Sequence, residues 1–298
     1  MAVKLKTSQD RDLRAAINPL NHPICLTMPK RLTRYSFWHE HIPFAMFLVD
    51  ILRPSLIVEL GTHYGDSYCA FCQAVRALRL DTRCYAIDTW QGDSHIGTYG
   101  PEVLANLRGH HDPLYGGFSN LIQSSFEEAL QHFVDGTIDI LHIDGTHTYE
   151  AIKGDFESWF RKVSSRGVVL LHDTNVRERG FGVSRFWDEI RSRYANFEFL
   201  HGSGLGMLVP HQVNCEELRA MLDATDEGKE RIRSSFFQLG HRVAMEVSAR
   251  VTLEQLMNSR SWKLTAPLRK LSSGLRCIRE RLAYANSRSR DEAPHRPG

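Results

Sequence analysis

Short apolar runs alternate with segments of helical periodicity over most of the chain. The apolar runs predict strands over residues 56–58, 84–87, 121–122, 137–143, 167–171, 197–200 and 205–209. Apolar residues that recur every three or four positions predict helices over residues 43–51, 66–80, 102–108, 125–133, 149–163 and 183–194. This alternation is typical of an α/β domain with a doubly wound, mostly parallel sheet of seven strands. The last two strands flank a Gly-Ser-Gly turn, which predicts an antiparallel hairpin at one edge.

The pattern changes at both ends of this alternating region. Residues 1–35 are polar and irregular, and they predict an N-terminal extension lying on the body. The α/β domain is expected to cover residues 36–212. Charged helical periodicity predicts a helical extension over residues 213–286, followed by a disordered tail over residues 287–298.

The end of the helical extension carries an apolar seam. Its residues recur at 4-3-4-3-4 spacing, as in a coiled coil: Leu264, Leu268, Leu271, Leu275, Ile278 and Leu282. From residue 260 onward there are ten Lys or Arg against three acids, so this tail has a charge of +7. Because the net charge of the chain is +2, the remainder has a charge of −5. Three interpretations stay open: a helix packed on the body or a second subunit, a partner-docking helix, and a helix on an anionic membrane surface. Gly274 weakens a free-standing helix and favours docking.

Composition excludes several classes of protein. No apolar run has the length of a membrane span, and the N-terminus has no apolar core of a secretory signal. Cys69 and Cys72 have CxxC spacing, but they lie in a helical pattern without a second pair, so core cysteines are favoured over a zinc or redox site. The basic tail lacks interleaved aromatic residues, which argues against nucleic-acid binding. We therefore expect a cytoplasmic protein, with peripheral contact at the inner membrane face as an option for the basic helix.

The turn after the first strand predicts a nucleotide-like ligand. Glu59 ends the apolar run, Gly61 and Gly65 follow, and a helix begins, so backbone amides are free to meet a ligand. Asp88 ends the next strand, where a carboxylate suits ribose hydroxyls. A dinucleotide site would have G-x-G-x-x-G, but Thr62 and the next residue occupy the position of the second glycine. The turn therefore suits an adenosine ligand without a pyrophosphate, such as S-adenosylmethionine.

A second polar group follows two later strands. Asp144 begins an Asp-Gly-Thr-His sequence that ends at His147, and His172-Asp173 follows the next strand. If these strands are neighbours, the two aspartates face a gap sized for a divalent cation, with magnesium or manganese favoured by oxygen ligands. His147 is placed to take a proton from a substrate there. Each aspartate alone is also explained as a turn or helix cap, and His142 is interpreted as structural; the combined pattern favours function.

Four motifs within residues 38 to 210 share the pattern of one family. They are Val-Glu-Leu-Gly-Thr-His-Tyr-Gly, Ala-Ile-Asp-Thr-Trp-Gln-Gly-Asp, Leu-His-Ile-Asp-Gly-Thr-His-Thr-Tyr-Glu and Leu-Leu-His-Asp-Thr-Asn. They resemble the class I S-adenosylmethionine-dependent methyltransferases, and among them the group that includes macrolide-sugar O-methyltransferases and cephalosporin-hydroxylase-like proteins. The resemblance implies a Rossmann-like methyltransferase fold with S-adenosylmethionine as cofactor.

The resemblance also implies roles for individual residues. Those expected at the cofactor are Glu59, Gly61, Thr62 and Gly65 on the methionine side, Asp88 at the ribose, and Ser124 or Ser125 near the adenine. A magnesium ion is expected at Asp144 and the pair at 172–173, with His147 as the base. His172 stands where metal-dependent members have an acid, and two carboxylates with a histidine bind magnesium less well than three carboxylates.

The tail adds an expectation about the acceptor. Ser-Arg-Ser-Trp-Lys-Leu-Thr-Ala-Pro-Leu-Arg, at residues 259–269, resembles a short motif of bacterial polysaccharide-assembly proteins, including glycosyltransferases. We therefore expect an O-methyltransferase that acts on a sugar hydroxyl in surface-polysaccharide or glycoconjugate synthesis, with a homo-oligomer or a glycosyltransferase partner formed through the C-terminal helix. Two alternatives are a hydroxylase-like relative and a non-catalytic, methyltransferase-shaped scaffold that recruits glycosyltransferases.

Overall fold

The computed structural model describes residues 17–267 and 269, except 36, 94–96, 179, 212–214 and 268. The chain divides into two compact units, of which the first runs to Val247 and the second begins at Ser248. Most of the predicted α/β alternation lies in the first unit, so the site is built there.

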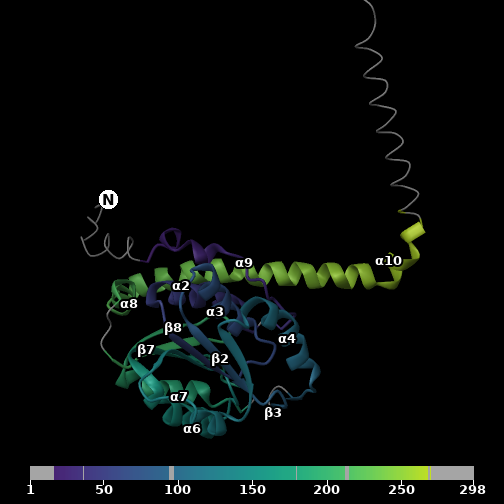
Figure 1. The fold of residues 1–298 in the computed structure, drawn as a ribbon. Coiled ribbons are helices and arrows are strands. Elements are labelled where there is room, and N and C mark those ends of the chain that lie inside the picture. The colour runs from purple at the N-terminus through teal and green to yellow at the C-terminus, as the bar shows by residue number, and fades with distance from the viewer. Residues whose placement is uncertain are drawn as a thin grey trace, which may run out of the picture. The chain divides into compact units, whose positions relative to one another are not determined.

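A seven-stranded sheet forms the centre of the first unit (Figure 1). Its strands are β1 (Leu56–Leu60), β2 (Arg83–Asp88), β5 (Ser119–Gln123), β6 (Ile138–Ile143), β7 (Val163–His172), β8 (Ala195–Phe199) and β9 (Leu205–Val209). The strand order is β5-β2-β1-β6-β7-β9-β8, and only β9 runs antiparallel to its neighbours. A separate small hairpin joins β3 (Gly92–Asp93) to β4 (Gly97–Thr98). The expected mostly parallel sheet with a terminal antiparallel hairpin is confirmed.

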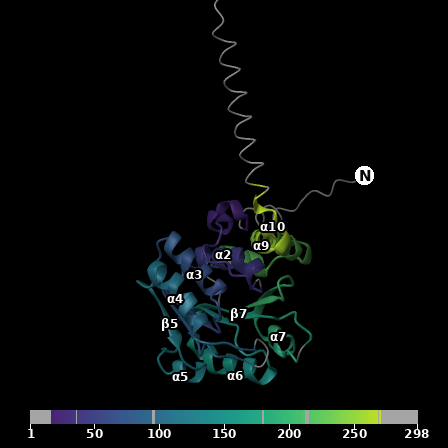
Figure 2. The ribbon, with the colours of Figure 1, turned by 90° about the vertical axis from the view of Figure 1, so that its right-hand side faces the viewer.

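Helices cover both faces of the sheet, as Figure 2 shows. One layer contains α2 (Ile42–Leu52), α3 (Asp66–Ala77) and α4 (Glu102–Tyr115), and the other contains α5 (Phe126–Leu130), α6 (Tyr149–Trp159) and α7 (Val183–Ile190). Successive strand side chains point to opposite faces, so Ile57 joins the core under α2 and α3 while Val58 joins the core under α6 and α7. Both faces of the central strands are buried, which explains their continuous apolar runs.

Several boundaries differ from those that periodicity predicts, and two of them show the physical reason. Helix α4 continues beyond residue 108 to Tyr115 although Pro113 lies inside it, because Leu104, Leu107, His111 and Tyr115 recur on one buried face. Helix α6 ends at Trp159, and a 3₁₀ turn over Phe160–Lys162 leads into β7 at Val163, where the pattern had predicted more helix. Tertiary packing overrides local propensity in both places.

The first unit includes more of the chain than the predicted domain. Helix α8 (Glu216–Leu222) and the first part of α9 (Asp226–Asn258) belong to it. Phe236 of α9 packs against Phe44, Phe47 and Phe199, with ring centroids 5.2 to 5.7 Å away. A side chain at Gly240 would overlap the carbonyl oxygen of Glu40, so α9 lies directly on the 3₁₀ turn over His39–His41.

The second unit is described only in its first part. Ser259 caps α10 (Arg260–Leu264) by accepting a hydrogen bond from the Trp262 amide at 3.2 Å. The Arg269 guanidinium lies 3.7 Å from the centre of the Trp262 ring. Leu264, the first residue of the predicted seam, is exposed, and the other seam residues lie outside the described residues, as does the predicted tail over 287–298.

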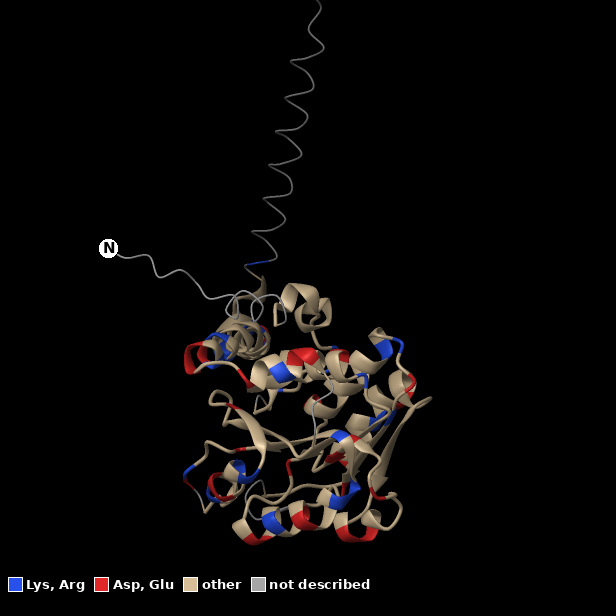
Figure 3. Cartoon of the chain, turned by 90° about the vertical axis from the view of Figure 1, so that its left-hand side faces the viewer, with Lys and Arg blue, Asp and Glu red and all other residues tan. Residues whose placement is uncertain are grey.

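The described segment from residue 17 to α2 contacts the helical layer. It contains short 3₁₀ turns over Pro19–Asn21, Pro23–Leu26 and His39–His41. Outside this segment, another 3₁₀ turn, Arg191–Arg193, follows α7. The main chain of the segment before α2 is fixed at two points, since the Lys30 amide donates to the Gln73 side chain and the Thr33 amide to Asp66. In the view of Figure 3, basic and acidic residues are interspersed along the helices of both layers. Over the described residues, no helix combines the length and the hydropathy that a membrane span requires.

Candidate functional site

A cavity of about 610 Å³ opens at the carboxyl ends of β1, β6 and β7. Its lining includes most of the turn after β1, the polar residues after β6 and β7, and aromatic residues from four segments: Tyr35, Phe37, Trp38, Tyr64, Tyr99 and Phe181. A second cavity of about 220 Å³ continues past Asp88, Ser125 and Phe126 and shares Gly61 and Asp144 with the first. Ligands bind at this end of open α/β sheets.

The glycines of the β1–α3 turn are required by the chain's own backbone. Gly61 has φ of 84°, and a side chain there would overlap the carbonyl oxygen of Asp144. Its amide donates to the Ile87 carbonyl at 2.9 Å, which ties the turn to β2. Gly65 has φ of 77° at the start of α3, a conformation that glycine adopts without strain. The turn and the residues after β6 therefore meet backbone to backbone.

Asp88 organises this turn through its carboxylate. One oxygen accepts hydrogen bonds from the amides of Thr62 and His63, each at 2.8 Å, and the other accepts from the Trp90 amide at 2.7 Å. A carboxylate has about four lone-pair sites, so room for one further donor remains. The expected ribose contact stays a prediction, and the structure adds a role that the sequence pattern did not indicate: Asp88 holds the turn in shape.

Glu59 lies behind the turn rather than in a cavity wall. It is fully buried, and its Oε2 lies 2.8 Å from Nδ1 of His142. The indole N–H of Trp38 donates to Nε2 of His142 at 3.2 Å, so Nδ1 carries the hydrogen that Glu59 accepts. Burial raises the pKa of Glu59, and the hydrogen bond with His142 opposes that rise. The interpretation of His142 as structural matches this contact, whereas contact of Glu59 with a cofactor remains a prediction.

The two serines after β5 start helix α5. Ser125 caps it by accepting a hydrogen bond from the Glu128 amide at 3.2 Å, and Glu128 completes a capping box. The Ser124 amide donates to the Asp88 carbonyl at 3.1 Å. Ser125 lines the smaller cavity and Ser124 lines neither. Of the two residues expected near an adenine, Ser125 is therefore the better placed.

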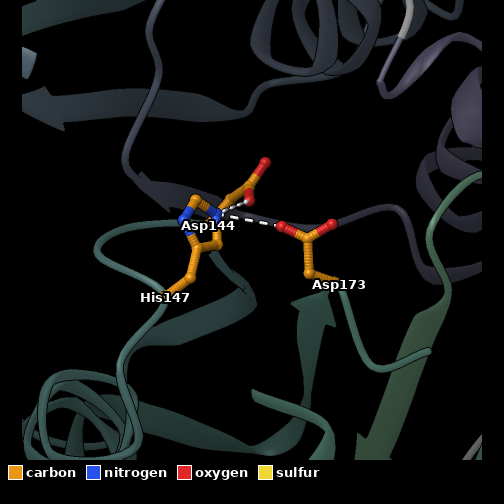
Figure 4. Close-up of side chains that lie close together, drawn as sticks. All are labelled: Asp144, His147 and Asp173. Atoms are coloured by element: carbon orange, nitrogen blue, oxygen red, sulfur yellow. Dashed lines mark ion pairs between the residues drawn. The ribbon is translucent and has the colours of Figure 1, made fainter. Parts of the chain in front are cut away.

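Three charged side chains converge where β6 and β7 end (Figure 4). Nε2 of His147 lies 2.9 Å from Oδ2 of Asp173 and 3.6 Å from Oδ1 of Asp144. Each of the three residues offers one possible ligand atom, and these three atoms all lie within 4.8 Å of one another. Strands β6 and β7 pair in parallel, which places their ends side by side. The predicted meeting of Asp144 and Asp173 is thus observed as geometry, but the histidine grouped with them is His147, expected as the base, rather than His172, expected as a ligand.

His172 is a second histidine at the same carboxylates. It is buried, and its Nδ1 lies 3.3 Å from Oδ1 of Asp144 and 3.4 Å from Oδ1 of Asp173. Its Nε2 lies 3.2 Å from the carbonyl oxygen of Gly202, to which it donates. This is the arrangement of a metal-ligating histidine, whose second nitrogen donates to a backbone carbonyl. Burial opposes a charge on His172, but Asp173 and Asp144 outweigh it and raise the pKa well above its usual value.

The carboxylates hold their charge strongly. Burial alone would raise the pKa of Asp173, yet the nearby His172 and His147 lower it to about 2. The pKa of Asp144 is likewise held well below its usual value, against burial, by His172 and His147. Asp173 has φ of 62°, a left-handed conformation that aspartate tolerates better than most residues. Strained backbone of this kind gathers at functional sites.

His147 is charged at neutral pH when only protein groups surround it. Burial lowers its pKa, but Asp144 and Asp173 outweigh burial and raise the pKa to about 9. Its ring stacks on Phe181, with centroids 4.6 Å apart. A general base must be neutral. The predicted base role therefore requires that the charge of the two carboxylates be offset.

The donor set fits a divalent cation. In octahedral coordination at roughly 2.1 Å, neighbouring ligand atoms lie roughly 3.0 Å apart, and the distances from His172 and His147 to the two aspartates range from 2.9 to 3.6 Å. Two carboxylates suit magnesium or manganese, and an imidazole ligand moves the preference toward manganese and other transition metals.

The sequence pattern missed the aromatic wall of the cavity. Tyr35 stacks on Tyr64 with centroids 4.7 Å apart, and Phe181 stacks on His147. Trp38 donates a hydrogen bond to His142 from the first residues of the predicted α/β domain, just before α2. The only sequence signal for this wall was the local density of aromatic residues at 35–38. That signal does not indicate which residues elsewhere in the chain these rings contact.

Comparison with known proteins agrees with this geometry. Residues 58–174, which include both the β1 turn and the polar residues after β6 and β7, match the family model described as a methyltransferase domain. Residues 58–174 therefore resemble a methyltransferase domain, which agrees with the class I, S-adenosylmethionine-dependent type that the four sequence motifs predicted.

Relatives of the methyltransferase domain are found among curated proteins and solved structures. An uncharacterized protein of Sinorhizobium fredii is 50% identical over 189 residues, which are 63% of this chain and 20% of that protein. The chain therefore spans about a fifth of the length of that relative.

The solved structures are more distant. The SAH-bound methyltransferase of Podospora anserina is 13% identical, with a TM-score of 0.46 over 71% of this chain and 100% of the other. An O-methyltransferase of Bacillus cereus in complex with SAH is 15% identical, with a TM-score of 0.43 over 69% of this chain and 92% of the other.

Proposed function

We propose that this protein is an S-adenosylmethionine-dependent O-methyltransferase whose acceptor is a sugar hydroxyl. The observation that carries the proposal is the convergence of Asp144, His147, His172 and Asp173 on the cavity that also contains the β1 turn. A cofactor bound at the turn would present its methyl group near these side chains, and an acceptor hydroxyl would approach from the aromatic side of the cavity.

The acceptor hydroxyl needs activation because its pKa is far above neutrality. Asp144, His172 and Asp173 would hold a divalent cation, which would polarise a bound hydroxyl and offset the two negative charges. With the charge of the carboxylates offset, the pKa of His147 would no longer be raised by them, and the neutral imidazole accepts the hydroxyl proton at Nε2. Phe181 keeps the imidazole ring oriented by stacking on it.

Transfer is an in-line displacement at the methyl carbon. The new oxygen–carbon bond forms as the carbon–sulfur bond breaks, and the proton of the acceptor remains on His147. Gly61 and Asp88 position the cofactor by fixing the turn, and holding oxygen, carbon and sulfur in line contributes much of the rate.

The proposal extends to the setting of the reaction. The motif at residues 259–269 supports a role in surface-polysaccharide or glycoconjugate synthesis, at the cytoplasmic side of the membrane. The exposed Leu253, Leu256 and Met257 on α9 support docking of a second copy or a glycosyltransferase through the C-terminal helices.

Calorimetry with S-adenosylmethionine followed by mass spectrometry of candidate glycans tests the proposal. Binding of the cofactor and a mass increase of one methyl group per acceptor, dependent on manganese or magnesium, are expected. Cofactor binding with oxidation in place of methylation would favour the hydroxylase-like alternative. An absence of cofactor binding would favour the scaffold.

A further inference from the structure

A basic cavity lies beside the proposed active site. It has a volume of about 450 Å³, and its lining includes three cationic side chains and no carboxylate: Lys30, Arg31, Leu32, Thr33, Arg34, Tyr35, Tyr64, Asn106 and His110. Tyr35 and Tyr64 also line the active-site cavity, so the two spaces share a wall. The proposed sites for the cofactor and for the divalent cation do not include these three cationic side chains.

Arg31 is the fixed centre of this cavity. Its side chain is buried, and its guanidinium donates to the Tyr64 carbonyl at 2.5 Å and to the Asn106 side chain at 2.7 Å. Both partners are neutral, and within the described residues no carboxylate forms an ion pair with Arg31. A buried guanidinium without a counter-ion is costly unless a ligand supplies the charge.

Asp66, an acid next to the cavity, is engaged by other groups. Asp66 accepts hydrogen bonds from the amide and hydroxyl of Thr33 and lies 3.6 Å from His39. It lines the active-site cavity rather than the basic one. Burial, followed by the charge of Arg31, lowers the pKa of His110 in the same wall. Asp66 opposes this lowering less strongly than Arg31 promotes it, so the protein offsets only part of the positive charge of the cavity.

Arg34 and Lys30 complete the set from the rim. Both are exposed, and Arg34 donates to the Tyr35 hydroxyl at 3.1 Å while its guanidinium lies 5.2 Å from the centre of the Tyr35 ring. Arginine forks suit phosphate and carboxylate oxygens, and stacked aromatic rings beside them suit the face of a sugar or a base.

We propose that the basic cavity binds an anionic group, phosphoryl or carboxylate, carried by the acceptor whose hydroxyl reaches His147. This inference rests on the proposed function, because it names the acceptor of that same site as an acidic sugar. Arg31 provides the fixed contact, and Lys30 and Arg34 close on the anion from the surface. The shared wall of Tyr35 and Tyr64 sets the span between anion and reacting hydroxyl.

Calorimetry on the full chain with three probes tests the inference. Glucose 1-phosphate and glucuronate are the two anionic probes, which separate phosphoryl from carboxylate recognition, and glucose is the neutral one. We expect at least one anionic probe to bind roughly tenfold or more tightly than glucose, with a preference that weakens as salt rises. Equal affinity for all three probes would overturn the proposal.

Matched variants assign any preference to this cavity. The double variant Lys30→Gln, Arg34→Gln should weaken the anion preference, because only Arg31 remains. Arg83→Gln should keep the preference, since Arg83 is an exposed cation at the amino end of β2. A preference that is unchanged in the double variant would also overturn the proposal. Affinity for S-adenosylmethionine is measured separately, so failure of methyl transfer and failure of anion binding are distinguishable.

Discussion

The turn after β1 and the polar residues after β6 and β7 handle buried charge in opposite ways. At the turn, Asp88 accepts three backbone amides and is satisfied by the protein itself. After β6 and β7, Asp144 and Asp173 pair with two histidines among the described residues, His147 and His172, at distances from 2.9 to 3.6 Å. The first arrangement is held by the backbone and leaves room for one further donor, and the second balances two carboxylates with two protonated histidines, a positive charge that a cation could supply in their place.

This difference separates shape from chemistry. Amide hydrogen bonds to Asp88 fix the backbone, so loss of that carboxylate would alter the form of the turn. The histidine contacts of Asp144 and Asp173 are charge-dependent and change with pH and cation. Removing charge from the second region should therefore affect reaction more than folding, and distorting the first should affect both.

The largest effect is expected where the two regions touch. Gly61→Ala adds a methyl group that overlaps the Asp144 carbonyl and forces φ of 84° on a residue with a side chain. We expect a loss of roughly 3 kcal/mol or more in the free energy of unfolding, measured by urea titration. Gly154→Ala is the control, because its added methyl group meets open space in α6, and it should stabilise by up to about 1 kcal/mol. A Gly61 variant as stable as the wild type would contradict the backbone contact between the regions.

Removing charge after β7 should stop the reaction and spare the fold. Asp173→Asn keeps the shape of the side chain and tolerates φ of 62°. We expect manganese binding to weaken and methyl transfer to fall at least roughly 100-fold, with affinity for S-adenosylmethionine unchanged by calorimetry. Asp223→Asn, an exposed site at the end of α8, is the control and should behave as wild type. Normal turnover in the Asp173 variant would remove Asp173 from the cation site.

His147→Gln tests which of the two histidines binds the cation. If His147 is the base and His172 the ligand, methyl transfer should fall by roughly 10² to 10⁴ while manganese affinity stays near that of the wild type. The measurement is a single-turnover rate alongside calorimetry. A parallel loss of manganese affinity would make His147 a ligand, an outcome that its 2.9 Å distance to Asp173 also permits.

The sequence alone predicted the architecture because strand and helix periodicities were strong. It also predicted that Asp144 and Asp173 meet, since both follow parallel strands that are neighbours in the sheet. It could not predict that Asp88 is engaged by amides or that Glu59 is buried against His142, because those contacts depend on how a turn folds back. Trp38, at the end of the N-terminal segment, reaches the site through packing that no local pattern records.

A third carboxyl group has neither kind of partner. Asp155 lies on α6 next to Gly145, and over the described residues it forms no ion pair. Burial raises its pKa to about 7. It therefore differs from Asp88, whose carboxylate accepts hydrogen bonds from backbone amides. It also differs from Asp144 and Asp173, which nearby histidines keep charged.

The smallest effect is expected at this carboxyl group, and it depends on pH. The folded pKa of about 7 lies above the usual 3.8, so the folded state binds an extra proton between these values. Stability from Asp155 therefore falls as pH rises from about 4 to about 7. Relative to wild type, Asp155→Asn should gain about 2 kcal/mol of unfolding free energy between pH 5 and pH 8. Urea titrations at both pH values measure it, and Asp81→Asn, exposed between α3 and β2, should show no such gain. A gain independent of pH would mean that the Asp155 carboxyl is charged in the folded state.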